Sequence, residues 1–535
     1  YVIRTSLQRN ANQMNDTKNI YRPERSVVFA VGLFALLLSL APGCGGTQEE
    51  LIVQGKKDKP LTHSENHLGQ WPQFRGPEGN AIAHGQSIPL EFGPDQNELW
   101  RVELPGGHSS PCVWDDRVFV TGYEKNTLKM ICLDAGNGDV LWDHERKIKE
   151  LGDYVHVAGS PANPTAATDG RRVVFFFDDF GVVVTDLHGA LIWEKELPST
   201  DNNFSYGASP ILDNDCIYLN HDGGDDSCLL CLDADTGTER WKTSRPNMEW
   251  GFSTPYLFNQ KARRLVLLGG TGELVAYDAG TGGSVWYSTG FPQFVCPSPV
   301  AAENTVFFGG WTTSHVAGRA KIDTVFDHDA GVSPESMEDP KELIAQFDLD
   351  NDGSLTRDEF PAGRARDAFA YSDVDKNGSY NLEELAPLYD EEPTRPGRNV
   401  LLAIDAGGSG DVTTSHLRWE HTKGLPYVAS PLAYRGRVFL VAQGGKMTCI
   451  DAKSGPPQFT KKRLDAHGEY YATPVAVGDH IVVCAQSGPI FLIKADDQLE
   501  VVHRTDLGEP IFATPAIARN TLFVRSEKHL WAFGN

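Results

Sequence analysis

With 535 residues, the chain has room for several domains or for one large all-β repeat domain. Its 53 glycines and 32 prolines are spread along the chain, which indicates turns rather than one disordered tract. The formal net charge of −24 argues against a nucleic-acid partner, because phosphate binding needs a basic face. Residues 321–398 hold 20 acidic and 8 basic side chains, so bound cations are expected in that segment.

The N-terminal residues predict export. Arg22 and Arg25 precede an apolar run over 27–40, followed by Ala-Pro-Gly-Cys, a pattern typical of a signal peptide rather than a membrane span. Cys44 resembles the acylated cysteine of a bacterial lipoprotein, although Ala41 stands where such sites usually have Leu. We expect a leader and signal peptide over 1–44, lipid attachment at Cys44, and a polar tether over 45–71. Ordinary cleavage or an uncleaved anchor is the alternative. The expected location is the periplasm or cell envelope, with membrane contact only through the lipid.

One phrase then recurs along the chain: a small residue and Pro, a variable stretch, and an apolar run rich in β-formers. The intervals between the repeat prolines are 41 to 53 residues, except for one of 132. A period in the low forties with several short strands per unit is typical of propeller blades. The repeat prolines are Pro111, Pro164, Pro210, Pro255, Pro299, Pro431, Pro474 and Pro515.

A second phrase follows the first, as in LDAGNGDVLW (133–142), LDADTGTERW (232–241) and YDAGTGGSVW (277–286). Its Asp can accept turn N–H groups, its Gly supplies positive φ, and its Trp offers a flat surface to the next blade. Each unit therefore has four strands. The last unit ends at HLWAFGN after its third strand, whereas a spare Trp strand, ELWRVEL (98–104), precedes the first unit. We predict that this strand completes the last blade and closes a ring of eight.

These repeats, with the opening WPQFRGPEGNA (71–81), resemble the pyrroloquinoline-quinone (PQQ)-like repeat family over 72–310 and 399–535. The resemblance implies a propeller fold. In the PQQ-dependent dehydrogenases it also implies a disulfide between adjacent cysteines and Glu, Asn and Asp near a cofactor calcium. The sequence has no Cys-Cys pair and no acid placed by such a motif, so we do not expect PQQ.

The long interval holds an insert, 311–398, with two twelve-residue loops, DLDNDGSLTRDE (348–359) and DVDKNGSYNLEE (373–384). Both match the calcium loop of an EF-hand, in which carboxylate, carbonyl and water ligands surround the ion. We expect helices over 337–347, 365–372 and 382–389, and pairing between Leu355 and Tyr380. Because the insert separates the second and third strands of blade five, it is expected beside the channel mouth. The predicted Ca²⁺ ligands are Asp348, Asp350, Asp352, Ser354, Thr356 and Glu359 in site one, and Asp373, Asp375, Asn377, Ser379, Asn381 and Glu384 in site two.

Aromatic residues precede most of the Pro strands. They either line the channel as a stacking funnel or pack under the blade loops, and we favour the second interpretation. His108 is likewise interpreted as a loop histidine with a satisfied ring. Cys132, Cys231 and Cys449 share one repeat slot and are interpreted as core packing, while Cys228 and Cys231 should point to opposite faces of a strand. The aromatic residues are Tyr206, Trp250, Phe252, Phe294, Tyr427, Tyr470, Tyr471 and Phe512.

The predicted fold is all-β: an eight-bladed β-propeller with a small α-helical EF-hand insert. The predicted function is a calcium-binding, non-catalytic envelope protein that acts as an interaction or ligand-binding scaffold for an unidentified protein or small molecule. A PQQ-dependent oxidoreductase is the first alternative, which leaves enzyme activity open. An outer-membrane protein assembly factor is the second.

Overall fold

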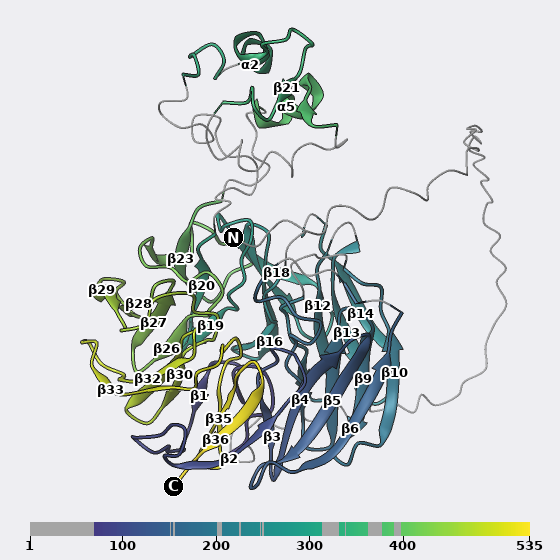
Figure 1. Cartoon of the computed structure of the whole chain (residues 1–535), viewed down its shortest axis with the longest axis vertical. Helices are drawn as coiled ribbons and strands as arrows, with labels where there is room; N and C mark the ends of the chain where they lie inside the picture. The colour runs from purple at the N-terminus through teal and green to yellow at the C-terminus, as the bar shows by residue number, and fades with distance from the viewer. Residues whose placement is uncertain are drawn as a thin grey trace, which may run out of the picture. The chain divides into compact units, whose positions relative to one another are not determined.

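A computed structural model describes residues 69–149, 151–152, 156–200, 206–223, 226–246, 248, 251–312, 331–337, 339–361, 377–389 and 397–535. Eight four-stranded antiparallel sheets form the blades of a propeller (Figure 1). The predicted leader and almost all of the predicted tether, including Cys44, lie outside the described residues. No helix in the described part of the chain is both long enough and apolar enough to cross a membrane.

The first four blades follow the predicted repeat strand by strand. In blade 1 most residues of the second and third strands are buried, while the outermost strand largely alternates between half-buried and exposed side chains. Neighbouring blades cover both faces of the inner strands, so their sequences are continuously apolar. The strands are β3 (Cys112–Trp114), β4 (Arg117–Glu124), β5 (Thr127–Asp134) and β6 (Val140–Lys147); β7 (Ala167–Thr168), β8 (Arg172–Phe177), β9 (Gly181–Asp186) and β10 (Leu191–Glu196); β11 (Ile211–Asp213), β12 (Cys216–His221), β13 (Cys228–Asp233) and β14 (Glu239–Ser244); and β15 (Tyr256–Gln260), β16 (Arg263–Gly270), β17 (Glu273–Asp278) and β18 (Ser284–Thr289).

The last four blades include the interrupted one and the closing one. Blade 8 takes its fourth strand from the N-terminal side of the chain, because β2 (Glu98–Glu103) pairs with β36 (His529–Phe533). The predicted closure is thereby confirmed, and the sheet order gives eight blades. The remaining strands are β19 (Val300–Ala302), β20 (Thr305–Gly310), β23 (Val400–Asp405) and β25 (Leu417–His421) in blade 5; β26 (Leu432–Tyr434), β27 (Arg437–Ala442), β28 (Lys446–Asp451) and β29 (Pro457–Arg463) in blade 6; β30 (Val475–Val477), β31 (His480–Cys484), β32 (Pro489–Lys494) and β33 (Val501–Asp506) in blade 7; and β34 (Ala516–Ala518) and β35 (Thr521–Arg525) in blade 8. Blade 4 gains a short fifth strand, β24 (Gly410–Asp411), parallel to β18.

Tryptophans of the outermost strands join one blade to the next. The Nε1 of Trp193 in blade 2 donates to the carbonyl of Ala234 in blade 3 at 2.9 Å. Gly237, at φ 69°, lies over the same indole, and a Cβ there would come within 2.7 Å of the ring. The predicted roles of the motif Trp and Gly are therefore confirmed, with close approach as a second reason for glycine. Trp100, Trp142, Trp241 and Trp419 make the same bond to Ala135, Leu187, Ala279 and Ala452.

An N-terminal cap, residues 69–88, crosses the far ends of the innermost strands. Trp71 is fully buried and exchanges two backbone hydrogen bonds with Val113 of blade 1. Strand β1 (Ile82–Ala83) adds in parallel to β30 of blade 7, and Ser87 bonds Asn520 of blade 8. This cap was not predicted, because its contacts join residues that are far apart in the chain.

The described part of the insert contains two helices and a two-stranded sheet. Helix α2 (Pro340–Phe347) is capped at its N-terminus by Asp339, whose side chain accepts the N–H of Lys341, and at its C-terminus by Asp348, the first residue of the predicted calcium loop. Helix α5 (Leu382–Tyr389) matches the predicted exit helix. Strands β21 (Leu355–Thr356) and β22 (Ser379–Tyr380) pair Leu355 with Tyr380, as predicted. These elements share a small core of Leu343, Leu355, Phe360, Tyr380 and Leu385. The predicted middle helix, 365–372, lies outside the described residues.

Candidate functional site

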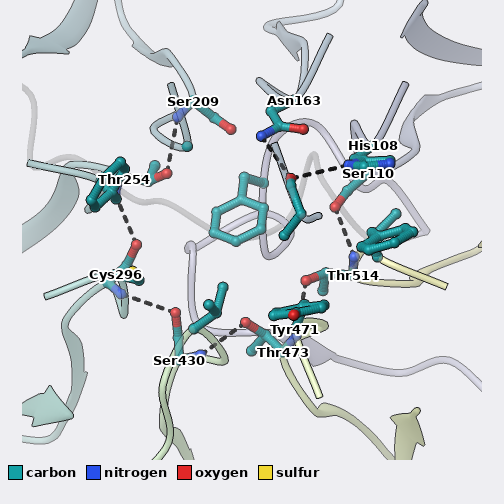
Figure 2. A pocket seen from close by; sticks show the side chains of 18 of the residues that line it. His108, Ser110, Asn163, Ser209, Thr254, Cys296, Ser430, Tyr471, Thr473 and Thr514 are labelled. Carbon is teal, nitrogen blue, oxygen red and sulfur yellow. Dashed lines mark hydrogen bonds between the residues drawn. The ribbon is translucent and has the colours of Figure 1, made fainter. Parts of the chain in front are cut away.

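The centre of the propeller carries a closed ring of hydroxyl groups, one from each blade. Figure 2 labels six of these eight residues. The backbone N–H of each ring residue donates to the hydroxyl oxygen of the ring residue in the next blade, at 2.9–3.2 Å. The eighth bond returns from Thr514 to Ser110 and completes the circle. Within the described residues, none of these hydroxyls donates to a protein acceptor, so each O–H remains available to a ligand or to water. The ring residues are Ser110, Thr165, Ser209, Thr254, Ser298, Ser430, Thr473 and Thr514.

The ring corrects the predicted alignment of blade 2. In blade 3 the ring residue Ser209 precedes Pro210, and β11 begins at the next residue. In blade 2 the ring residue is Thr165, so Ala166 holds the proline position and Pro164 lies two residues too early. The assignment of Pro164 to the repeat was therefore wrong. The hydroxyl, not the proline, is present in all eight blades.

An aromatic arc surrounds the mouth of the pocket that this ring lines. The ring of Phe512 is stacked on His108, with centroids 4.0 Å apart, and on Tyr471, at 5.7 Å. His156 meets Tyr471 and Tyr427 edge-on, at 6.0 and 6.1 Å. Phe252 and Phe294 line the pocket as well. The cavity has a volume of about 240 Å³, enough to admit an aromatic ring with its substituents.

The structure divides the predicted aromatics into two groups. Tyr206 and Tyr470 are buried in blade cores, as the favoured interpretation held. Phe252, Phe294, Tyr427, Tyr471 and Phe512 line the pocket, so for them that interpretation was wrong. His108 fits both interpretations, since Nδ1 contacts the carbonyl of Ala158 at 3.1 Å while the ring lines the pocket. Trp250 lies outside the described residues.

The N-terminal cap supplies the inner wall of this pocket. Phe74 lines the cavity. The neighbouring side chain, Arg75, is only 1% exposed and donates to the carbonyls of Ser298, Pro299 and Pro431 at 3.0–3.4 Å. No carboxylate of the described residues pairs with it, and burial lowers its pKa to about 10. A buried cation therefore lies just behind the hydroxyl ring.

The groups that line the pocket are neutral near pH 7. Burial lowers the pKa of His108 to about 4 and also lowers that of His156. Burial raises the pKa of the Tyr471 phenol and of the Cys296 thiol to about 12 in each case. A general acid or base is most effective when its pKa lies near the working pH, and a thiol of such high pKa is a poor nucleophile. The described lining thus favours binding over acid–base or nucleophilic chemistry.

The insert joins the propeller at this pocket. Thr312, the last described residue before the insert, lines the cavity. Its N–H donates to the side chain of Asn399, which donates back to its carbonyl, at 3.0 and 3.1 Å. Just before it, Gly310 pairs with Val400. Both ends of the insert are therefore held together at the rim, on the predicted face of the propeller.

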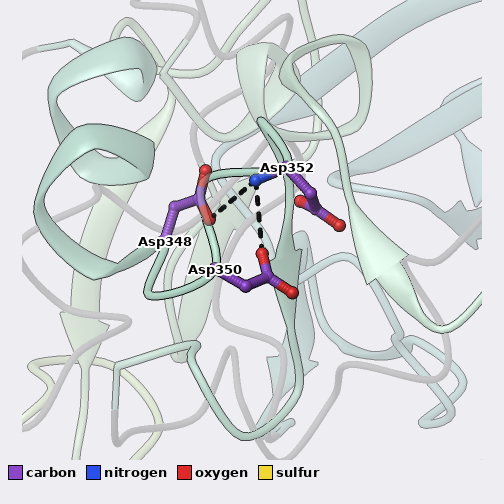
Figure 3. Close-up of side chains that lie close together, drawn as sticks. All are labelled: Asp348, Asp350 and Asp352. Carbon is purple, nitrogen blue, oxygen red and sulfur yellow. Dashed lines mark hydrogen bonds between the residues drawn. The ribbon is translucent and has the colours of Figure 1, made fainter.

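The first predicted calcium loop is folded around its own carboxylates (Figure 3). Oxygens of Asp348, Asp350 and Asp352 lie within 4.8 Å of one another. Asp348 accepts the N–H groups of Asn351 and Gly353 at 2.7 and 2.9 Å. Glu359, at the twelfth position, accepts the N–H of Leu349 at 3.0 Å, which turns its carboxylate back across the loop. The Thr356 hydroxyl also donates to Glu359 and holds the pKa of that carboxyl below its usual range.

Only the last eight of the twelve residues of the second loop, 377–384, belong to the described residues. Asn377 accepts the N–H of Ser379 at 2.8 Å, and Glu384 accepts that of Asn381 at 3.1 Å. The latter bond matches the one between Thr356 and Glu359 in the first loop. Asp373 and Asp375 lie outside the described residues.

A protein-family comparison decides the family. The PQQ_2 family model, described as outer membrane protein assembly factor BamB, matches residues 93–248, 225–318 and 393–529, more than half of the chain. The chain belongs to this family. The unmatched interval, 319–392, falls within the insert, so the family accounts for the propeller and not for the predicted calcium loops. No curated protein matches the chain.

Two solved structures share the family's propeller fold. BamB from Moraxella catarrhalis is 13% identical, with a TM-score of 0.51, over 82% of this chain and 99% of that one. A europium-containing methanol dehydrogenase is 10% identical, with a TM-score of 0.51, over 88% of this chain and 99% of that one. At these identities the likeness shows the fold alone, because one propeller scaffold supports binding and catalysis alike.

Proposed function

We propose that this protein is a calcium-binding, non-catalytic scaffold of the cell envelope whose propeller binds a partner or ligand through the channel pocket. The observation that carries the proposal is the pocket itself: eight hydroxyls and six phenylalanine and tyrosine side chains line one cavity. Large apolar pockets with a few convergent polar groups are typical binding sites.

The pocket favours an aromatic group that carries a hydrogen-bond acceptor. Phe252, Phe294 and Phe512 offer apolar surface near the mouth, while the ring hydroxyls offer O–H donors further in. The uncompensated charge of Arg75 behind the ring adds attraction for an electron-rich end. The matching occupant is an aromatic side chain of a partner protein or a small aromatic compound with an oxygen-bearing substituent.

The first loop fits calcium by the chemistry of its donors. Calcium takes six to eight hard oxygen ligands. Asp348, Asp350 and Asp352 would supply three carboxylates, and Glu359 would supply two further oxygens. The Ser354 carbonyl and a water held by Thr356 would complete the set. The same positions in the second loop are Asp373, Asp375, Asn377, Ser379, Asn381 and Glu384.

The junction at Thr312 and Asn399 supports a place for the calcium module beside the pocket mouth. Bound calcium would order the two loops around their ions and so define one wall of the approach to the pocket. The predicted export is compatible with weak calcium binding, because extracellular calcium modules need an affinity of only ~10⁻⁴–10⁻³ M.

Calorimetric titration of the full chain with calcium chloride tests the metal assignment. We expect two sites, and we expect Glu359→Ala with Glu384→Ala to abolish the heat, since each glutamate is the bidentate ligand of its loop. Asp358→Ala with Glu383→Ala is the matched control, because these acids stand one position earlier and are not predicted ligands. No heat at millimolar calcium would show that the metal assignment is wrong.

Fluorescence of 1-anilinonaphthalene-8-sulfonate, an aromatic sulfonate, tests the pocket. We expect Phe512→Ala and Tyr471→Ala each to weaken binding of the dye about tenfold, because stacking of a planar ring on an aromatic side chain contributes about 1–3 kcal/mol. Tyr434→Ala is the control, since this tyrosine lies on β26 and is not part of the lining. Equal weakening by all three variants would argue against the pocket as the binding site.

The quinoprotein alternative finds no support in the lining. PQQ is expected to bind with a calcium ion held by Glu, Asn and Asp, yet no carboxylate is among the described residues that line the pocket. The residues present do not fit that cofactor. The assembly-factor alternative is favoured by the family match. It predicts that deleting the protein lowers the amount of folded outer-membrane proteins, whereas a scaffold outside that process would leave them unchanged.

A further inference from the structure

Two cysteines of blade 3 lie in contact across neighbouring strands. Cys216 begins β12, and Cys231 lies on β13. Cys216 is directly opposite Asp233, so Cys231, two residues before that Asp, is on the same face of the sheet. Their Sγ atoms are 2.9 Å apart, closer than two sulfurs in ordinary van der Waals contact. Both residues are buried: Cys216 is 9% exposed, and Cys231 is not exposed at all.

The same slots in other blades show that this contact is specific to blade 3. Cys132 of blade 1 and Cys449 of blade 6 also stand two residues before the motif Asp. The residue opposite that Asp is Arg117 in blade 1 and Arg437 in blade 6, where blade 3 has Cys216. Cys132, Cys231 and Cys449 are therefore equivalent in the repeat. Of these three, Cys231 alone has a second cysteine, Cys216, at the position opposite the motif Asp.

A cation lies beside the pair. Arg240 donates from Nη1 to the Sγ of Cys216 at 3.1 Å and is held by Asp233 at 2.7 Å. The hydrogen bond from the Cys231 thiol, followed by the charge of Arg240, lowers the pKa of Cys216 to about 6, while the same bond raises that of Cys231. These directions favour Cys216 as the attacking thiolate and Cys231 as the neutral thiol, an arrangement suited to thiol–disulfide exchange.

We propose that Cys216 and Cys231 are a redox-active dithiol that closes to a disulfide between strands β12 and β13 of blade 3. The oxidant is a low-molecular-weight disulfide. The Cys216 thiolate attacks one of its sulfurs, forms a mixed disulfide and releases one small thiolate. The Cys231 thiol then loses its proton, its sulfur attacks the Cys216 sulfur, and the second small thiolate leaves. The protein pair loses two electrons, which reduce the small disulfide to two thiols.

Mapping of the full chain after treatment with oxidised glutathione tests the proposal. Free thiols are alkylated, and an Asp-specific endoproteinase separates residues 215–221, which contain Cys216, from residues 226–232, which contain Cys231. We expect two of the nine thiols to disappear and these two peptides to be linked. A Cys228→Ser variant should keep the link, which assigns it to Cys231. Cys132, whose diagonal neighbour on β4 is Arg117 instead of a second cysteine, should stay alkylated as the internal control.

Three outcomes would overturn the proposal: both peptides alkylated, the link lost in Cys228→Ser, or a glutathione adduct on Cys216 with Cys231 still alkylated. Melting gives an independent readout. The two cysteines are 15 residues apart, so the oxidised chain should melt about 3–6 °C above the reduced one. Cys216→Ser should melt at one temperature with or without reductant, and a reductant-dependent shift that persists in this variant also contradicts the pair.

Discussion

The contact between a turn glycine and the preceding blade's tryptophan can be tested by one methyl group. Gly237 has a φ of 69°, and a Cβ there would lie 2.7 Å from the Cε3 of Trp193. An L-residue in this left-handed conformation costs about 1–2 kcal/mol. Forcing extra volume into a packed contact costs a further 1–3 kcal/mol or so. We therefore expect Gly237→Ala to destabilise the fold by about 2–5 kcal/mol.

Gly508→Ala is the matched control. Gly508 has a φ of 68°, almost the same as that of Gly237, but a Cβ there would meet no atom within 4 Å. It carries the backbone cost without the contact, and part of that cost is offset because alanine restricts the unfolded chain. We expect a loss of about 1 kcal/mol or less.

Urea unfolding followed by far-ultraviolet circular dichroism measures both free energies of unfolding without using tryptophan emission, which Gly237→Ala would itself disturb. The difference between the two variants isolates the inter-blade contact. If the losses of unfolding free energy in Gly237→Ala and Gly508→Ala agree within about 0.5 kcal/mol, the Trp193 indole can move aside without cost, and the close-approach argument is refuted.

Two further predictions concern the pocket. Thr254→Val keeps the shape of a ring residue but removes the hydroxyl that accepts the Ser209 N–H at 3.0 Å, so the free energy of unfolding in urea should fall by about 1–2 kcal/mol. Thr127→Val, whose side chain is outside the ring, is the control and should lower it by less than about 0.5 kcal/mol. Equal losses in the two variants would contradict a structural role for the ring. Burial lowers the pKa of His108 from its usual 6.5 to about 4. Between these two pH values the unfolded chain binds a proton at His108 that the folded chain does not. The free energy of unfolding therefore falls as the pH drops from 6.5 to 4. His108→Phe, which keeps a ring against Phe512, should flatten that fall in thermal melts, and an unchanged profile would contradict it.

The blades were predictable because their signals are local. Each strand needs only a short apolar run, and each turn needs an Asp and a Gly at fixed spacing, as at Asp233 and Gly237. The closure followed from counting strands, since the spare strand around Trp100 and the three-stranded last unit complete each other. The helix over 382–389 and the pairing of Leu355 with Tyr380 also followed from the spacing of the loops.

The pocket was harder to predict because its residues come from every blade. A small residue before each repeat proline was visible in the sequence. The role of its hydroxyl becomes clear only in the folded ring, where the hydroxyl accepts the N–H of the ring residue in the previous blade at 2.9–3.2 Å. Pro164 concealed the register of blade 2, where Thr165 follows the proline instead of preceding it. A search for a hydroxyl in every repeat, rather than for a proline, would have found the ring.

The cap and the insert act on the two ends of one channel that the ring keeps rigid. Arg75 enters from one end and binds two carbonyls beside the ring. One is that of the ring residue Ser298, and the other is that of Pro431, which follows the ring residue Ser430. The insert leaves from the other end, where the bonds between Thr312 and Asn399 hold its two junctions together, so its length places no strain on blade 5. A loop closed in this way tolerates long insertions at little entropic cost. The propeller can therefore carry the predicted calcium module at the rim without changing the eight hydroxyls that shape the pocket. A ligand in that pocket would meet the same inner surface with or without calcium. Calcium bound to the insert should therefore change access to the pocket more than the pocket's intrinsic affinity for the ligand.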